Sequence, residues 1–261
     1  MQLDRRGFIE SLSFLFTLSN LGIDPIIRYD IILNEVPEAK QHIDFINHCR
    51  AKYANIFNVP LEVLAYHFHL ESEYNPKVIS PRLAVGIAQF MRDTAKNFGL
   101  RIYDKKKYAD LSLLEDEVDS NYTVLRDLER GKEGFVQLFY QNRFPEAEKL
   151  KEKYDELKVK NTGLVGKFRK QFSDYARDDN FDRRTNPHES IEAGVHLLAK
   201  SCAEAEKIFG GRREHNIIRG IAVCNYGPQA LDDLGLPNVR ETIRHIRRIM
   251  AFSDRVYSQL N

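Results

Sequence analysis

The sequence has almost no net charge, few cysteines and no long apolar run, and each shortage excludes a class of protein. Lys and Arg number 39 against 38 Asp and Glu, a formal charge of +1, so no global field attracts nucleic acid or an anionic membrane. No apolar run approaches the roughly 20 residues of a membrane span. The three cysteines, Cys49, Cys202 and Cys224, are odd in number and widely spaced, which indicates neither a disulfide framework nor a zinc cluster.

What remains is a chain of 261 residues with 43% apolar residues, enough for a sizeable core in one or two domains. Apolar residues recur at helical spacing between Ile43 and Ile56 and in later segments, which predicts a mainly α fold. Residues 1–36 are predicted to be a helical extension. Arg5-Arg6 followed by Leu12–Leu18 has the outline of an export signal, but the acidic residues around it and the lack of a cleavage site favour an ordinary amphipathic helix.

The most informative stretch is 61–99. Residues 61–70 read LEVLAYHFHL, which predicts a buried helix with Glu71 in its last turn, ended by the breaker Asn75-Pro76. A second helix is expected from about Val85 to Ala95. A carboxylate on an apolar helix beside a loop can have a raised pKa and act as a general acid, as cleavage of a glycosidic bond requires. The alternative is a helix-end residue that points to water.

The residues after Glu71 form a spaced series: Glu71-Ser72, Asn75-Pro76, Ser80, Ala84-Val85-Gly86-Ile87-Ala88-Gln89, Met91 and Thr94-Ala95. This series resembles the catalytic segment of soluble lytic transglycosylases and goose-type lysozymes, although Leu83 and Ala88 stand where that family usually has Gly and Met. The resemblance implies that Glu71 is catalytic, that Ser80 and Gln89 hydrogen-bond the sugar or peptide stem, and that Met91 lines the sugar site. Taken alone, Gln89 reads as a loop cap and Met91 as core packing.

The C-terminal part continues the resemblance. A helix over 189–198 and a helix over 217–224 precede Asn225-Tyr226-Gly227, which is similar to the family's Tyr-Asn-Ala-Gly motif and implies that Asn225 and Tyr226 bind substrate. Cys224 occupies the usual Tyr position and Tyr226 the usual Ala position. Either Tyr226 substitutes by another route, or the site is weakened. The resemblance covers about 57–100 and 181–255.

The predicted organisation is therefore a lysozyme-like helical domain made of residues 37–100 and 181–261, with an N-terminal extension and a helical insertion at 101–180. Acidic and basic residues alternate over 146–160, as on a solvated helical hairpin. The insertion is either such a hairpin alone or a lid or docking surface for a protein partner. Its basic and aromatic residues between 167 and 175 more readily form a packed helix face than a nucleic-acid site.

The function that the resemblance implies is lytic transglycosylation of peptidoglycan. Glu71 would cleave the MurNAc-β-1,4-GlcNAc bond as acid and then base, leaving 1,6-anhydro-MurNAc ends, in a periplasmic or cell-wall-facing protein that needs no cofactor. Three alternatives stay open. One is a muramidase, which commonly needs a second carboxylate. Because Glu73 points away from Glu71 on a helix, such an enzyme would use Asp182 or Glu192 instead. The second is a weakened peptidoglycan-binding scaffold. The third, disfavoured because His69 lies on another helix face, is a metal-dependent hydrolase using His67, His69 and Glu71.

Overall fold

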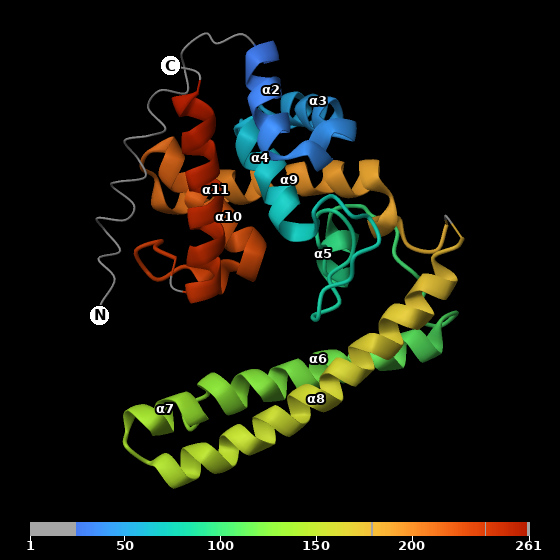
Figure 1. The fold of residues 1–261 in the computed structure, drawn as a ribbon, viewed down its shortest axis with the longest axis vertical. Helices are drawn as coiled ribbons and strands as arrows, with labels where there is room; N and C mark the ends of the chain where they lie inside the picture. Colours follow the sequence, from blue (N-terminus) through green and yellow to red (C-terminus); the bar gives the residue numbers. More distant parts are fainter. Residues whose placement is uncertain (1–24, 179, 238, 260–261) are drawn as a thin grey trace. The chain divides into compact units, whose positions relative to one another are not determined.

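The structure, a computed structural model, describes residues 25–178, 180–237 and 239–259, and it confirms a mainly α fold (Figure 1). The possible export signal and most of the predicted N-terminal extension lie outside the described residues. The described chain divides into two compact units: residues 25–75 together with those from Pro187 form one, and Pro76–Asn186 forms the other. The assignment of 101–180 as an insertion into a lysozyme-like domain stays a prediction.

The first unit is a helical assembly built around α4 (Leu61–Ser72). Helix α4 packs against α11 (Arg240–Ser258) and α3 (Ile43–Tyr53), and α9 (Pro187–Phe209) packs against α10 (Arg213–Tyr226) and α3 (Figure 1). Shorter elements complete the unit: α2 (Pro25–Glu35), η1 (Pro37–Gln41) and η3 (Pro228–Ala230). The apolar run that predicted a buried helix has no exposed residue, and all of it is buried except the half-buried Tyr66, His69 and Leu70. Even Glu62, 0% exposed, receives a hydrogen bond from the Tyr257 hydroxyl at 2.5 Å.

Helix α4 ends just after Glu71, slightly earlier than the Asn75-Pro76 breaker alone predicts. Glu73 and Tyr74 both adopt left-handed backbone conformations, with φ of 51° and 59°, which L residues with side chains adopt only at a cost. The buried Tyr74 offsets that cost, because its hydroxyl donates to the Ala65 carbonyl at 2.8 Å and its ring stacks on His42. The chain therefore turns away from the helix axis at a fixed point, with Glu71 in the last turn.

The second unit contains α5 (Arg92–Asn97) and a helical hairpin. Helices α6 (Ala109–Arg130) and α8 (Phe144–Tyr175) run side by side, joined through α7 (Phe135–Tyr140), and η2 (Arg183–Thr185) follows (Figure 1). The apolar residues of the loop around 79–85 join the hairpin's buried cluster, whose members are Ile79, Leu83, Val85, Tyr103, Leu111, Val118, Leu164, Val165, Phe168, Phe172 and Phe181. Phe168 and Phe172 are thus core residues, as the packed-face interpretation expected, and their rings are not available for stacking on bases.

The predicted helix from Val85 to Ala95 is wrong in its first half, because α5 begins only at Arg92. Val85 instead exchanges backbone hydrogen bonds of 3.1 Å with Phe90 and forms a bridge with Ile79. Leu83 and Gln89 have φ of 62° and 47°, so the loop turns left-handed at both. Leu83 stands where the resembled family usually has Gly, and its positive φ explains that preference.

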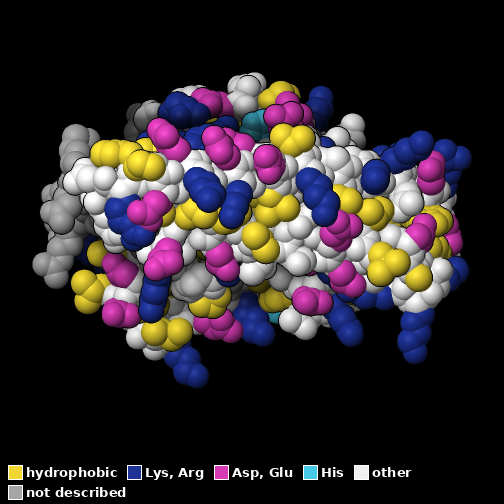
Figure 2. Space-filling model, turned by 90° about the horizontal axis from the view of Figure 1, so that it is seen from below, with side chains coloured by type: hydrophobic (Ala, Val, Ile, Leu, Met, Phe, Trp, Pro, Cys, Tyr) yellow, Lys and Arg dark blue, Asp and Glu magenta, His cyan; other side chains and the backbone are white. Residues whose placement is uncertain are grey.

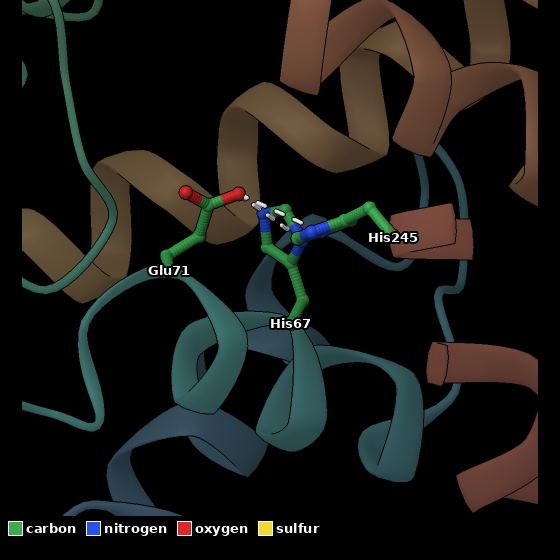
Figure 3. Close-up of side chains that lie close together, drawn as sticks. All are labelled: His67, Glu71 and His245. Atoms are coloured by element: carbon green, nitrogen blue, oxygen red, sulfur yellow. Dashed lines mark hydrogen bonds and ion pairs between the residues drawn. The ribbon is translucent and has the colours of Figure 1, made fainter. Parts of the chain in front are cut away.

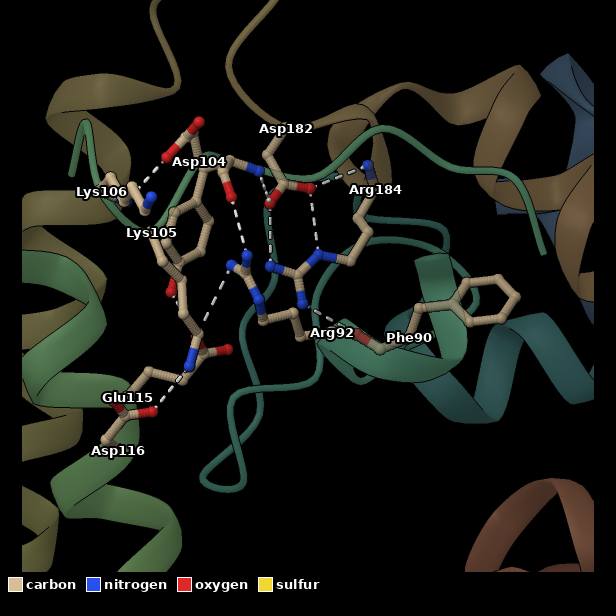
Figure 4. Close-up of polar contacts among 10 residues, drawn as sticks. Phe90, Arg92, Asp104, Lys105, Lys106, Glu115, Asp116, Asp182 and Arg184 are labelled. Carbon is tan, nitrogen blue, oxygen red and sulfur yellow. Dashed lines mark hydrogen bonds and ion pairs between the residues drawn. The ribbon is translucent and has the colours of Figure 1, made fainter. Parts of the chain in front are cut away.

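A buried polar cluster ties the loops of this unit together (Figure 4). Arg184 is 0% exposed and Asp182 2%, and two hydrogen bonds of 2.9 and 3.0 Å join the guanidinium to the Asp182 carboxylate. Arg184 also donates to the Phe90 carbonyl at 3.2 Å, while Arg92 donates to the Tyr103 carbonyl at 2.9 Å. A buried charge pair with its hydrogen bonds satisfied holds three separate loop segments in one arrangement.

The surface carries both signs of charge. Lys and Arg side chains alternate with Asp and Glu over the face in view in Figure 2, in keeping with a net charge of +1. Among the described helices, none is both long enough and apolar enough for a bilayer crossing.

Candidate active site

Glu71 is a largely buried side chain of the first unit and lies beside two histidines. Its side chain is 18% exposed, and its Oε1 lies 4.0 Å from His67 Nδ1 and 3.6 Å from His245 Nε2 (Figure 3). His67 is one turn earlier on α4, so the i,i+4 spacing puts both side chains on one face. His245 comes from α11, the helix packed against α4. The structure thus places the predicted acid inside the fold rather than in bulk solvent.

Burial gives Glu71 the protonation behaviour of a general acid. Desolvation raises its pKa from 4.5 to about 7, a hydrogen bond from Asn225 lowers it in part, and the negative charge of Glu241 raises it further. Removal of water penalises the charged carboxylate more than the neutral acid. A carboxyl group with a pKa near 7 can both give and take a proton at neutral pH.

The two histidines beside Glu71 are neutral at pH 7. Burial lowers the pKa of His67 to about 3, with His245 contributing, and lowers the pKa of His245 to about 4, with Arg248 contributing. The rings share a hydrogen bond of 3.3 Å between His245 Nε2 and His67 Nδ1. Because neither imidazole is charged, neither stabilises the Glu71 carboxylate as a cation would, and the raised pKa persists.

Asn225 reaches Glu71 from the end of α10. Thr242 on α11 donates to the Asn225 side-chain oxygen at 3.0 Å, which leaves the amide nitrogen to donate to the Glu71 carboxyl. Gly227, with φ of 83°, ends α10 just beyond. Three helices, α4, α10 and α11, therefore fix the acid and its neighbours.

Residues 48–130 match the family model of the Transglycosylase SLT domain. The chain carries a Transglycosylase SLT domain. An SLT domain indicates a transglycosylase that acts on peptidoglycan. Searches of the curated proteins and of the solved structures find no significant match. The SLT match includes His67 and Glu71, extends to the end of α6, and stops well before Asn225 and His245.

Cys224 and Tyr226 flank Asn225, outside the SLT match. Burial raises the pKa of the Cys224 thiol to about 12, with the Glu71 charge contributing, so the sulfur is a neutral thiol beside the acid. It donates to the Ser201 hydroxyl at 3.5 Å. A thiol is a weak donor compared with a tyrosine hydroxyl. Tyr226 is half-buried at the end of α10, and its role in substrate binding stays a prediction.

The other predicted binding residues of the SLT domain lie in the second unit and stabilise its loop. The Ser80 hydroxyl oxygen accepts from the backbone N–H groups of Arg82 and Ala84 at 3.2 and 3.0 Å. The Gln89 amide nitrogen donates to the Gly86 and Val78 carbonyls at 2.7 and 3.3 Å. Half-buried Met91 is the residue before α5. These contacts are those of loop caps, and the sugar-binding roles stay predictions.

The carboxylates considered as partners for Glu71 have other positions or contacts. Glu73 is exposed and caps the end of α4. Glu192 pairs with Lys52 and accepts from the Tyr53 hydroxyl at 3.1 Å, and Asp182 is held by Arg184. These three carboxylates are therefore engaged or placed elsewhere, whereas Glu241 lies near enough to raise the pKa of Glu71.

His245 and Thr242 are the site residues that sequence reasoning missed. The i,i+4 spacing of His67 and Glu71 was visible in the sequence. His69, the other histidine considered with them, instead has its Nδ1 atom 3.5 Å from Glu38 Oε2. His245 lies 178 positions after His67, in a helix with no catalytic motif of its own. The one available signal was its i,i+3 spacing from Thr242, which places both on one face of α11.

Proposed function

We propose that this protein is a lytic transglycosylase that cleaves the MurNAc-β-1,4-GlcNAc bond of peptidoglycan, with Glu71 as general acid and then general base. The observation that carries the proposal is the burial of Glu71 inside an SLT domain, with its pKa raised to about 7. Such a group is protonated in a large fraction of molecules at neutral pH, as the first proton transfer requires.

In the first step, protonated Glu71 donates to the glycosidic oxygen as the bond to the MurNAc anomeric carbon breaks. The substrate's N-acetyl group supports the positive charge that develops on the sugar. Neutral His67 and His245 add no competing acid on that side. Asn225 orients the carboxyl group, because its own oxygen is held by Thr242.

In the second step, the Glu71 carboxylate takes the proton of the MurNAc 6-hydroxyl, and that oxygen attacks the anomeric carbon. The product has a 1,6-anhydro ring, and no water is consumed. One carboxyl group suffices for this sequence, whereas retaining and inverting hydrolases commonly use two. The contacts of Glu73, Asp182 and Glu192 support the single-carboxyl route.

The finer assignments belong to the same proposal. Ser80, Gln89, Met91, Asn225 and Tyr226 are proposed to contact the glycan strand. A substrate of this kind implies a periplasmic or cell-wall-facing location. The hairpin is proposed as the surface for any protein partner, and it carries the exposed side chains Tyr140 (82%) and Leu113 (71%).

The test is digestion of purified sacculi at pH 6–7 with EDTA present, followed by mass spectrometry of the released muropeptides. Wild type is expected to release anhydro-muropeptides, and Glu71→Gln to lower the rate by about 10²–10⁴-fold, since the amide cannot donate or accept the proton. Glu73→Gln, two positions away and exposed, is the matched control and should retain the wild-type rate. Hydrated ends would indicate a muramidase, and binding without release would indicate the weakened scaffold.

A further inference from the structure

We propose that His67 Nδ1, Glu71 Oε1 and His245 Nε2 form a binding site for a divalent ion of the zinc class, and that the bound ion inhibits the enzyme by occupying its acid. The inhibitory part rests on the proposed function of Glu71, while the binding part stands on the geometry alone. These are the three residues drawn in Figure 3.

The three ligand atoms already have the spacing that a small cation requires. Their separations are 3.3, 3.6 and 4.0 Å, and atoms bound to one tetrahedral zinc ion lie about 3.4 Å apart. A point equidistant from the three lies about 2.1 Å from each, which is the usual zinc–ligand bond length. An ion therefore fits with shifts of a few tenths of an ångström, and a fourth position stays open for water.

Rigid elements hold this triangle. His67 and Glu71 are one turn apart on α4, and α11 packs directly on that helix. Thr242, one turn before His245, is fixed by its hydrogen bond to Asn225, and Asn225 in turn hydrogen-bonds Glu71. A ligand set supported by a second layer of hydrogen bonds loses little conformational entropy when the ion binds.

The ligand types select the class of ion. Two imidazoles and one carboxylate suit Zn²⁺, Co²⁺, Ni²⁺ and Cu²⁺, whereas Mg²⁺ and Ca²⁺ prefer shells made of oxygen. The three side chains are between 8% and 18% exposed. A bound ion would therefore exchange most of its bulk hydration for these ligands.

Binding of the ion removes the catalytic proton. The cation displaces the proton of the Glu71 carboxyl group to solvent, and the carboxylate oxygen becomes a metal ligand. The hydrogen that His67 Nδ1 and His245 Nε2 share moves to the other nitrogen of its ring, so that both ligand nitrogens offer a lone pair to the ion. Glu71 then has no proton for the glycosidic oxygen, and its lone pair is not free to accept one from the 6-hydroxyl. The ion and the catalytic proton are mutually exclusive on one oxygen, so inhibition should be complete at saturation and reversed by a chelator.

The experiment measures binding and activity separately on the full chain. Titration of metal-free protein with Zn²⁺ by calorimetry should show one site, and Co²⁺ should develop the visible absorption of a four- or five-coordinate ion. His245→Gln should weaken Zn²⁺ binding by about 100-fold or more, because one of three ligands is lost. His69→Gln, a histidine of the same helix that faces Glu38, should bind Zn²⁺ as wild type does. Circular dichroism and thermal melts establish that both variants are folded.

Activity on sacculi is then measured with EDTA and with stoichiometric Zn²⁺. The proposal is supported if wild type is fully active in EDTA, loses its activity with Zn²⁺ and recovers it when the ion is chelated. The variant His245→Gln should need far more Zn²⁺ to lose the same fraction of its own activity in EDTA. Equal Zn²⁺ affinity in wild type and His245→Gln would overturn the site, whatever the activity. Activity that requires Zn²⁺ would overturn the inhibitory role. If the three residues bind Zn²⁺ but the protein releases no anhydro product in EDTA, the proposed function is overturned and the metal site is still supported.

Discussion

The proton on Glu71 has a consequence for stability as well as for catalysis. Its folded-state pKa of about 7 lies above the ordinary 4.5, so the folded chain binds more protons than the unfolded chain between these values. Stability from this group is fully present below about pH 4.5 and is lost as the pH rises through 7. At pH 8 the buried carboxylate opposes folding.

Glu71→Gln should therefore be more stable than wild type at pH 8, by on the order of 1–3 kcal/mol, because a neutral amide replaces a buried charge. The gain should disappear near pH 4, where the acid is already neutral. Urea unfolding at both pH values, in EDTA, measures the difference. The exposed Glu73→Gln should show no such gain, and a gain of the same size in both variants would contradict the explanation by burial.

At the scale of elements, α9 and α10 meet at a glycine. A Cβ atom on Gly220 would lie 2.9 Å from the Cys202 backbone nitrogen, closer than packed atoms approach, and backbone cannot rotate away as a side chain can. Gly220→Ala should destabilise the protein by about 1–3 kcal/mol through overpacking. Thermal and chemical unfolding provide the measurement.

Gly163 on α8 is the matched control for that substitution. It is exposed in a helix interior, and a Cβ there meets nothing within 4 Å. Gly163→Ala should stabilise by about 0.5–1 kcal/mol, since alanine has the better helix propensity. If both alanine variants changed stability in the same direction, close packing of α9 on α10 would not explain why position 220 is a glycine.

Replacing one partner of the buried Asp182–Arg184 pair is expected to lower the stability of the protein strongly. Arg184→Met would leave the Asp182 carboxylate buried without its cation, which costs about 3–5 kcal/mol. The double variant Asp182→Asn with Arg184→Met removes the stranded charge and should recover a large part of that loss. Unfolding free energies of the three proteins test this, and an Arg184→Met variant as stable as wild type would contradict it.

The sequence predicted those helices whose position is determined by residues close together in the chain. The apolar period of 61–70 and the nearby breaker were sufficient for α4 and for Glu71 in its last turn. The start of α5 was misplaced because Leu83 and Gln89 carry positive φ values, which no residue-type preference indicates. His245 was not predicted as a site residue because its proximity to Glu71 depends on how α11 packs on α4, a contact between distant parts of the chain.

At the scale of the whole molecule, burial is uneven. Eight of the twelve residues of α4 are buried and none is exposed, whereas Leu138 is the one buried residue among Phe135–Tyr140 of α7. At this end of the hairpin Tyr140 is 82% and Phe144 49% exposed. Segments with few buried contacts open at low free energy, while core helices open only with global unfolding.

Amide hydrogen exchange should reveal this gradient. Peptides covering 135–140 are expected to exchange at least about 100-fold faster than peptides covering 61–72, because opening α7 exposes little apolar surface. The middle of α8, with Leu164, Val165 and Phe168 buried, is the internal control and should be protected although it belongs to the same hairpin. Equal protection of α7 and α4 would mean that the hairpin tip is held by contacts other than its own packing. Protection of α7 alone on addition of sacculi would place the tip against the cell wall rather than against a protein.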